Sequence, residues 1–337
     1  MELITPSYYH RFRCIAADCP DSCCKEWTVQ VDAASAAIYQ ALPGELGDHL
    51  RRVMVLEDGE WVLKLTADQR CPMWRDDGLC RIHAQLGEGA LCNTCRDFPR
   101  LRHDYGDFVE LGLELSCPEA AKWVLSAQTH EVDCAQVPGG EEPEYDLETM
   151  AILQRSRDEI LSFLEDTSYP VNHALAILLL FGYDVQNELD GGQPATLQPD
   201  ALLQEISKLK AAGSVSEILA FFEDLEVLTP QWTQLLRAPA VGAWCEEHRA
   251  LARYFVSRYW LQAVSDFDLV CRVKFAVISS LVIKTVGGDI YRTAQLYSKE
   301  IENNQDNVDA ILDGTCAAPA LVDRNLLGLL LADSPTI

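Results

Sequence analysis

Residues 12 to 27 read FRCIAADCPDSCCKEW, a short stretch that holds four of the thirteen cysteines of the chain. Asp18, Pro20, Asp21 and Ser22 separate these cysteines, and all four are residue types that favour turns. A chain that turns at these positions stays out of helix and strand, so neighbouring thiols can point toward a common centre. The stretch therefore predicts a thiol-lined loop.

Two further groups of thiols follow along the chain. Cys71 and Cys80 enclose an Asp-Asp-Gly turn that is typical of a short hairpin or knuckle. Cys92 and Cys95 form a C-x-x-C pair, and Cys117 follows after a strand-like run. Together these groups contain nine thiols: Cys14, Cys19, Cys23, Cys24, Cys71, Cys80, Cys92, Cys95 and Cys117.

The first residues, MELITPSYYHRFRC, do not form a signal peptide, so we expect a cytoplasmic protein. Disulfides are disfavoured in that compartment, and clustered thiols there more often hold metal. Four thiolates suit either zinc or an iron–sulfur cluster, and spacing alone does not separate the two. Free redox-active thiols and a merely cysteine-rich core are the other interpretations. His83 is more typical of a surface group than of a ligand.

The remaining cysteines, Cys134, Cys245, Cys271 and Cys316, lie in sequence that we expect to be helical, where a cysteine usually acts as a small buried hydrophobe.

Composition bounds the class of protein. Hydrophobic residues make up 48% and charged residues 23% of the 337 residues, as in ordinary globular proteins. The net charge of -25 argues against nucleic acid as a partner, because phosphate binding needs clustered Lys and Arg. An acidic surface attracts lysine-bearing substrates, although it also simply promotes solubility. Residues 269–286 are apolar, but three basic side chains interrupt them, which favours a buried amphipathic helix over a membrane span.

The pattern along the chain predicts a mainly α protein. We expect a cysteine-rich metal-binding module with short strands over residues 1–136, a linker over 137–146 rich in Pro, Gly and acid, and an all-helical domain over 147–337. Because the module has few strands, the metal should contribute to its folding free energy. No glycine-rich phosphate loop follows a strand, which argues against a Rossmann-like methyltransferase or dehydrogenase.

Within the module, a helix capped by Asp32 is expected over 31–54, either continuous or broken near Pro43-Gly44, and alternating patterns predict strands at 60–65 and 105–115. The helices expected in the C-terminal domain are 147–164, 171–187, 201–211, 215–225, 241–264, 269–286, 289–302, 308–312 and 320–331.

Four strings, FRCIAADCPDSCCKEWTVQVD, CPMWRDDGLCRIHAQLGE, TCRDFPR and LSCPEAA, occur in this order. In them the chain resembles the flagellin lysine N-methylase family, a branch of the cysteine-cluster proteins described as zinc- or iron-chelating. The resemblance spans about residues 3–125, and a looser likeness continues in VKFAVISSLVIKTVGGDIYRTAQLYSKEIENN.

This resemblance implies methyl transfer from S-adenosylmethionine to lysines of flagellin, with a [4Fe–4S] cluster held by cysteines. One cluster needs only four ligands, so either some matched thiols lie outside its coordination sphere or two metal sites exist. Cys92 lies outside the matched pattern. A non-catalytic iron- or zinc-chelating protein is the alternative function. The thiols matched by motif are Cys14, Cys19, Cys23, Cys24, Cys71, Cys80, Cys95 and Cys117.

A nucleophilic amine does not need radical chemistry, and Lys25-Glu26 stands where a radical C-x-x-x-C-x-x-C motif would place its third cysteine. We therefore expect a polar displacement, with the cluster as scaffold or as anchor for the amino-carboxylate end of S-adenosylmethionine. Candidate acid–base groups within the motifs are Asp21, Asp97 and Glu119, and candidate aromatic groups for a cation cage are Trp27, Trp74, Tyr8 and Tyr9.

Overall fold

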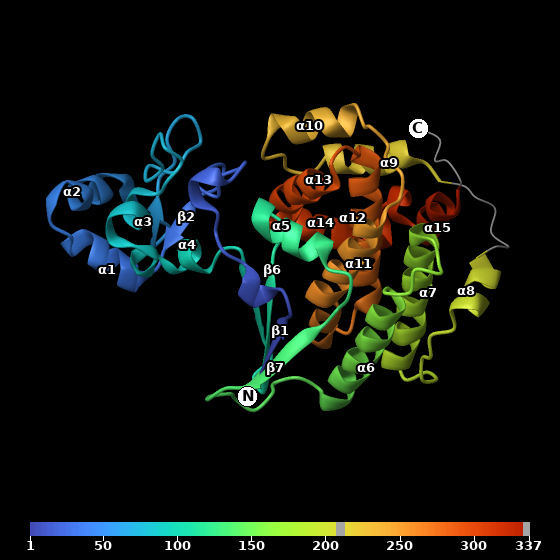
Figure 1. Ribbon diagram of the computed structural model, residues 1–337. Coiled ribbons are helices and arrows are strands. Elements are labelled where there is room, and N and C mark those ends of the chain that lie inside the picture. Colours follow the sequence, from blue (N-terminus) through green and yellow to red (C-terminus); the bar gives the residue numbers. More distant parts are fainter. Residues whose placement is uncertain (207–212, 333–337) are drawn as a thin grey trace. The chain divides into compact units, whose positions relative to one another are not determined.

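The computed structural model describes residues 1–206 and 213–332, and the chain divides into two compact units (Figure 1). The thiol-rich unit comprises Phe12–Leu101 with Cys117–Ala120. The helical unit comprises Met1–Arg11, Arg102–Ser116 and Ala121–Ile337. Helices dominate the described residues, which confirms the predicted mainly α class.

This division does not coincide with the expected one at residues 136–147. Strand β1 (Glu2–Pro6) pairs in parallel with β6 (Phe108–Leu113) and antiparallel with β7 (Val132–Gln136). These pairings place both ends of the expected module in the helical unit, because paired strands belong to the same sheet and therefore to the same compact unit. Residues 137–146 carry neither helix nor strand.

The thiol-rich unit contains a small antiparallel sheet and several short helices. The sheet has the order β2-β4-β3, and Asp58 and Gly59, both with positive φ, make the tight turn between β3 and β4. Its elements are β2 (Val29–Val31), α1 (Ala33–Ala41), α2 (Gly44–Val53), β3 (Met54–Glu57), β4 (Glu60–Leu63), α3 (Arg81–Leu86) and α4 (Asn93–Asp97), with short 3-10 turns at Ala16–Asp18 and Glu88–Ala90.

The helix expected over 31–54 is two helices. Asp32 caps α1 as predicted, since its side chain accepts a hydrogen bond from the Ser35 N–H at 2.9 Å. Leu42 leaves the helical region before Pro43, and α2 begins at Gly44. The proline explains the break, because it disfavours helical backbone in the residue before it.

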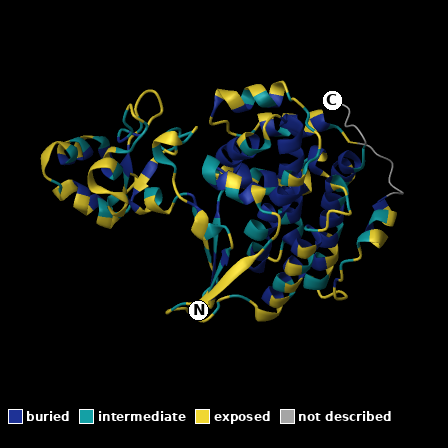
Figure 2. Ribbon diagram, viewed as in Figure 1, coloured by how far each residue is buried: buried dark blue, intermediate teal, exposed yellow. Residues whose placement is uncertain are grey.

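The core of the thiol-rich unit is small and includes cysteine. Figure 2 shows much of this unit exposed or half-buried. Since apolar burial drives folding, a core of this size provides limited stability alone. Its buried members are Val29, Val31, Ala36, Tyr39, Leu50, Met54, Leu63, Cys71, Met73, Ile82 and Cys92.

The helical unit combines a four-stranded sheet of order β5-β6-β1-β7 with a set of packed helices. Helix α12 contacts α7, α9, α11, α13, α14 and α15 and so forms its centre. The elements not yet given are β5 (Arg100–Asp104), which begins in the thiol-rich unit, α5 (Pro118–Ser126), α6 (Leu147–Phe163), α7 (Val171–Leu189), α8 (Pro199–Ile206), α9 (Val215–Glu223), α10 (Pro230–Arg237), α11 (Glu246–Tyr259), α12 (Leu269–Val286), α13 (Ile290–Tyr297), α14 (Gln305–Ala317) and α15 (Asp323–Leu331), with a 3-10 turn at Trp260–Val264 and a π-helical turn at Ser298–Glu302.

Helix α12 occupies its expected residues, but it is buried almost all round and is not amphipathic (Figure 2). Contacts inside the protein offset the cost of burying its two lysines. The Lys274 ammonium donates to the Thr315 carbonyl at 2.5 Å, and the Lys284 ammonium lies 5.7 Å from the centre of the Trp244 ring. Within the described residues, no helix is both long and apolar enough to cross a membrane.

Three helix predictions need correction. The helix expected at 241 begins only at Glu246, because Cys245 serves as its N-cap. The helix expected over 308–312 extends over Gln305–Ala317, capped by Asn304. Pro230, which lies between the helices expected over 215–225 and 241–264, begins a further helix, α10, at the position where proline fits a helix best. Residues 207–211 of the helix expected over 201–211 lie outside the described residues.

Candidate functional site: the thiol-rich unit

The cysteine loop at residues 14–24 lies outside helix and strand except for one short 3-10 turn, as predicted. Ala16 has a positive φ of 50°, and its backbone N–H donates to the Cys14 sulfur at 3.4 Å. The Ala16 carbonyl then accepts a hydrogen bond from the Cys19 N–H at 3.1 Å. These local bonds hold the Cys14 and Cys19 side chains on one short turn.

The segment between Cys71 and Cys80 forms the expected knuckle. Trp74 and Cys80 make an isolated antiparallel bridge, and Gly78 closes the turn with a φ of 81°. The Cys71 N–H donates to the Cys24 carbonyl at 2.7 Å, which ties the knuckle to the cysteine loop. Residues almost fifty positions apart thus meet at one place.

The last three cysteines of the unit lie at the starts of helices. Cys92 is the N-cap of α4, and Cys95 lies one turn into that helix. Cys117 directly precedes α5, and backbone hydrogen bonds from Ala120 and Glu119 reach its sulfur. Helix N-termini offer unpaired N–H groups and a positive dipole end, which stabilise thiolate.

The nine thiols separate into two groups by burial and by neighbours. Two of them, Cys71 and Cys92, are buried in the hydrophobic core of the unit, and three partly buried thiols pack against it: Cys24, Cys80 and Cys95. The other four lie outside that core, and two of these are exposed: Cys14, Cys19, Cys23 and Cys117.

Electrostatic interactions follow the same division. In the core group, Cys71 interacts with Cys24, Cys80 and Cys92, and Cys95 interacts with Cys24, Cys71 and Cys92. In the other group, Cys117 interacts with Cys19 and Cys14. Cys23 interacts with Cys14 and Cys117, and it also hydrogen-bonds its chain neighbour Cys24.

Two thiols of the unit have a lowered pKa. A hydrogen bond from the Cys23 side chain lowers the pKa of Cys24 to about 7, and one from Cys95 lowers the pKa of Cys92 to about 7. Burial instead raises the pKa of Cys71 to about 12 and that of Cys117 to about 11. Buried thiols need a nearby cation to remain ionised, and a coordinated metal ion supplies one.

The donor set fits a thiophilic metal ion or an iron–sulfur cluster, since all nine clustered side chains offer sulfur. One buried donor also lacks a partner: the Trp74 indole N–H, next to the bridge with Cys80, has no hydrogen-bond acceptor. A thiolate or sulfide there would satisfy it. Within residues 1–206 and 213–332, no group of three or more Cys, His, Asp or Glu side chains is placed so that it could hold one metal ion.

The other candidates have structural partners. The Asp21 carboxylate forms an ion pair with the Lys25 ammonium at 2.7 Å. The exposed Asp97 carboxylate pairs with the Arg96 guanidinium at 3.3 Å. Glu119 interacts electrostatically with Cys19. Among the aromatic candidates, the Trp27 indole N–H donates to the Cys23 carbonyl at 2.6 Å, and the Arg70 guanidinium lies 4.5 Å from the centre of the Trp74 ring. Burial raises the pKa of Tyr8, and the Tyr9 ring packs edge-on against His10. His83 is half-buried on α3.

The prediction that the four remaining cysteines are buried in helices is correct only for Cys271. Cys134 lies exposed on β7, and Cys316 is exposed on α14. The Cys271 and Cys316 sulfurs are 3.8 Å apart. Cys245 contacts the His248 Nδ1 at 3.1 Å, a pair that the C-E-E-H spacing at a helix start could have indicated.

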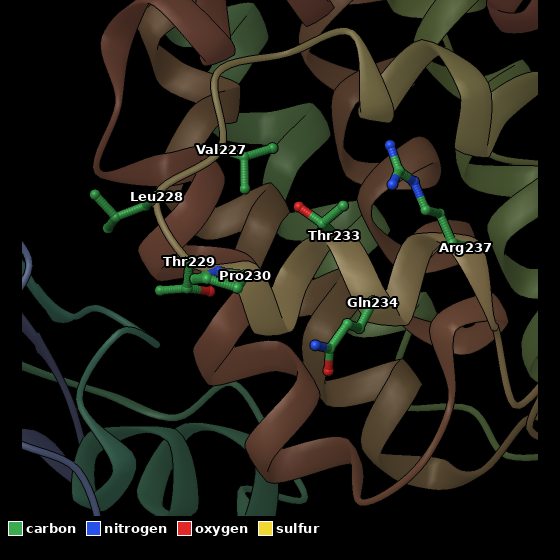
Figure 3. Close-up of a pocket in the computed structure, with 7 residues that line it drawn as sticks. All are labelled: Val227, Leu228, Thr229, Pro230, Thr233, Gln234 and Arg237. Atoms are coloured by element: carbon green, nitrogen blue, oxygen red, sulfur yellow. The ribbon is translucent and has the colours of Figure 1, made fainter.

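An open pocket of about 510 Å³ lies in the helical unit (Figure 3). Its lining contains no Cys, His, Asp or Glu, so it offers no group that could accept a proton from a lysine or hold a metal. The lining residues are Val227, Leu228, Thr229, Pro230, Thr233, Gln234 and Arg237.

These features define a mainly α protein with a thiol-rich unit. The chain is 34% identical over 128 residues to the lysine-N-methylase of Salmonella typhimurium, a match covering 36% of this chain and 32% of that protein. It is 32% identical over 127 residues to the flagellar biosynthetic protein FliU of Salmonella muenchen, and there it covers 75% of the relative.

The chain belongs to the family of these lysine-N-methylases and FliU, as the resemblance in the cysteine motifs predicts. It spans about a third of the length of the lysine-N-methylases that it matches. No protein-family model and no solved structure matches it.

Proposed function

We propose that this protein is an S-adenosylmethionine-dependent lysine N-methyltransferase that acts on flagellin, with a [4Fe–4S] cluster held by cysteines of the thiol-rich unit. The observation that carries the proposal is membership in a family whose other members are named lysine-N-methylase and flagellar biosynthetic protein FliU. The gathered thiols support the cofactor, and the net charge of -25 suits a cationic substrate.

The reaction requires a neutral amine, because a free lysine has a pKa of about 10.4 and its ammonium form has no lone pair. The amine nitrogen attacks the sulfonium methyl group, a C–N bond forms as the C–S bond breaks, and the thioether departs as S-adenosylhomocysteine. The proton of the amine passes to a base. When bound, the cluster would serve as a scaffold or as an anchor for the amino-carboxylate end of the methyl donor.

Among the carboxylates of the motifs, we propose Glu119 as the proton acceptor. Asp21 already pairs with Lys25 at 2.7 Å, and the side chain of Asp97 is 62% exposed, which leaves its carboxylate in water. Glu119 lies in the first turn of α5, two residues after Cys117, and interacts with Cys19. Glu119 is half-buried, and both of these cysteines lie outside the hydrophobic core of the unit.

Replacement of Glu119 by Gln should lower kcat by about 100-fold or more, the usual contribution of a general base. Metal content and folding should remain those of the unmodified protein. As a matched control, Asp97→Asn removes an exposed carboxylate of the same motifs and should leave kcat unchanged. Equal kcat in all three proteins would remove Glu119 from the mechanism.

The function itself is tested by anaerobic purification followed by incubation with methyl-labelled S-adenosylmethionine and flagellin. Label on flagellin lysines, located by peptide mass spectrometry, is the expected result. If metal-replete protein exchanges its metal reversibly and transfers no label, the chain is a metal-handling protein without catalysis, and the proposal fails.

A further inference from the structure

We propose that Cys271 and Cys316 form a reversible redox-modification site in the helical unit, where a small-molecule disulfide oxidises the two thiols to a bond between α12 and α14. The inference does not rest on the proposed function, because it involves neither the thiol-rich unit nor methyl transfer.

The two thiols lie side by side where two helices pack together. Cys271 is in the first turn of α12, and Cys316 is in the last turn of α14. Their sulfurs are 3.8 Å apart. Since a disulfide bond is about 2.05 Å long, the sulfurs must approach each other by only about 2 Å to form it.

Polar contacts on both sides of the pair hold these helix ends against each other. The Lys274 ammonium, one turn after Cys271, donates to the Thr315 carbonyl at 2.5 Å and pairs with Asp323 at 3.2 Å. The Thr315 hydroxyl oxygen lies 3.1 Å from the Cys271 sulfur. Because the fold brings the two thiols together in advance, their reaction with each other is intramolecular and favoured over reaction with a second small molecule.

The two sulfurs differ in access to solvent. Cys316 is exposed, whereas Cys271 is only 8% exposed. Burial raises the pKa of Cys271 to about 12, so this group is a protonated thiol at neutral pH. A dissolved disulfide therefore reaches Cys316 first, and Cys271 is the resolving thiol that completes the bond.

The reaction is a pair of thiol–disulfide exchanges. Cys316 gives its proton to water, and its thiolate attacks one sulfur of the small disulfide. A bond forms between these sulfurs as the original S–S bond breaks, and one small thiolate leaves. Cys271 then loses its proton and attacks the Cys316 sulfur, which releases the second small thiolate. Two protein thiols are oxidised to one disulfide, and the small disulfide is reduced to two thiols, which take up the protons.

The other cysteines of the helical unit have different surroundings. Among its described residues, Cys271 and Cys316 are the cysteines whose sulfurs contact each other. Cys134 is exposed on β7, and the Cys245 sulfur contacts the His248 Nδ1 at 3.1 Å. Cys134 should therefore keep a small-molecule adduct where Cys316 passes it on to Cys271.

The bond would stabilise the helical unit and would remain reversible. It joins the central helix α12 to α14 and closes the chain between residues 271 and 316 into a loop, which restricts the unfolded state. Because Cys316 is exposed, thiols in solution can attack the bond and reduce it again.

Peptide mapping tests the proposal on the full chain. Reduced protein is treated with bis(2-hydroxyethyl) disulfide, a neutral probe that the net charge of -25 does not repel, then alkylated and digested with trypsin. Peptides 259–272 and 300–324 contain one cysteine each, Cys271 and Cys316. We expect them to be linked to each other, and dithiothreitol should separate them.

Single variants identify the order of the two exchanges. Cys271→Ser should stop after the first, with a stable probe adduct on peptide 300–324. Cys316→Ser should leave peptide 259–272 unmodified in the time that links the two peptides in the unmodified protein. Cys271→Ala is a second variant of the buried position, and far-UV circular dichroism reports whether the helices persist.

Thermal unfolding measures the effect of the bond. Oxidation should raise the unfolding midpoint of the helical unit by roughly 10 °C, and reduction should reverse the rise. Cys134→Ser should show the same rise, whereas Cys316→Ser, treated identically, should show none.

A stable probe adduct on Cys316 of the unmodified protein, without linked peptides, would overturn the proposal. Modification of Cys271 at the same rate in folded Cys316→Ser would overturn the assignment of the exposed thiol as the first to react. Linked peptides without a rise in the unfolding midpoint would contradict the stabilising bond between α12 and α14.

Discussion

The thiol-rich unit and the helical unit stabilise their folds by different means. In the helical unit, α12 is surrounded by six other helices, and large apolar side chains such as Trp232 and Trp260 are fully buried. In the thiol-rich unit, the core contains only short elements and counts cysteines among its buried members. The comparison indicates that apolar burial provides much less stability in the thiol-rich unit, which would gain the most from the proposed metal.

The largest expected effect is that of metal removal. If the thiol-rich unit holds the proposed metal, a chelator should unfold this unit and leave the helical unit folded, because structural thiolate-bound metals contribute on the order of 10 kcal/mol of folding free energy. Amide hydrogen exchange measures this: protection should disappear in β2, β3 and β4 and persist in α7 and α12. Equal protection of the small sheet with and without metal would contradict the comparison.

The next effect concerns a buried ion pair of the helical unit. The Arg157 guanidinium on α6 donates to both Glu110 carboxylate oxygens, at 2.9 and 2.6 Å, and both side chains are nearly buried. Glu110→Ala would leave a buried cation unpaired and should cost about 3–5 kcal/mol in denaturant unfolding. The control is Glu223→Ala, whose exposed pair with Arg237 should contribute less than about 1 kcal/mol.

A smaller effect depends on pH. Burial lowers the pKa of His248 from 6.5 to about 4, so the folded helical unit holds it neutral while the unfolded chain binds a proton below 6.5. Its contribution to stability is complete above pH 6.5 and is lost as the pH falls toward 4, by roughly 3 kcal/mol. In His248→Gln, the unfolding free energy should vary less between these pH values. An unchanged slope would show that another group is responsible.

The smallest effect is local to the thiol-rich unit. Asp32 accepts hydrogen bonds from the Ser35 N–H at 2.9 Å and from the Asn93 N–H at 3.0 Å, which lower its pKa to about 2. Asp32→Ala removes this cap and should destabilise metal-loaded protein by about 1 kcal/mol, measured by thermal unfolding. Asp32→Asn, which keeps an accepting oxygen, should lose less than the alanine variant.

The sequence predicted what local chemistry determines. The cysteine loop, the knuckle between Cys71 and Cys80, the Asp32 cap and the long apolar helices depend on neighbouring residues, and each is present. Strand β1 was not predicted, because ELITP becomes a strand only through partners more than a hundred residues away. Tertiary pairing of that kind leaves no local signal.

For the site, the sequence predicted the set of thiols but not their grouping. Cys23 and Cys24 are indistinguishable in a motif, and only the fold assigns them to different neighbours. The electrostatic interaction of Cys117 with Cys14 and Cys19 likewise depends on the path of the chain through β5 and β6, which spacing does not reveal.

The parallel pairing of β1 with β6 has a consequence for folding during synthesis. Strand β1 leaves the ribosome before β6, and roughly a hundred residues must follow before this partner exists, which takes several seconds or more at cellular rates of translation. Closing a loop of that length costs about 4 kcal/mol in chain entropy. The segment between them includes residues 12–101 of the thiol-rich unit, so any compaction of that unit shortens the loop that must close. Early folding of the thiol-rich unit, with the proposed metal, should therefore raise the yield of the helical unit.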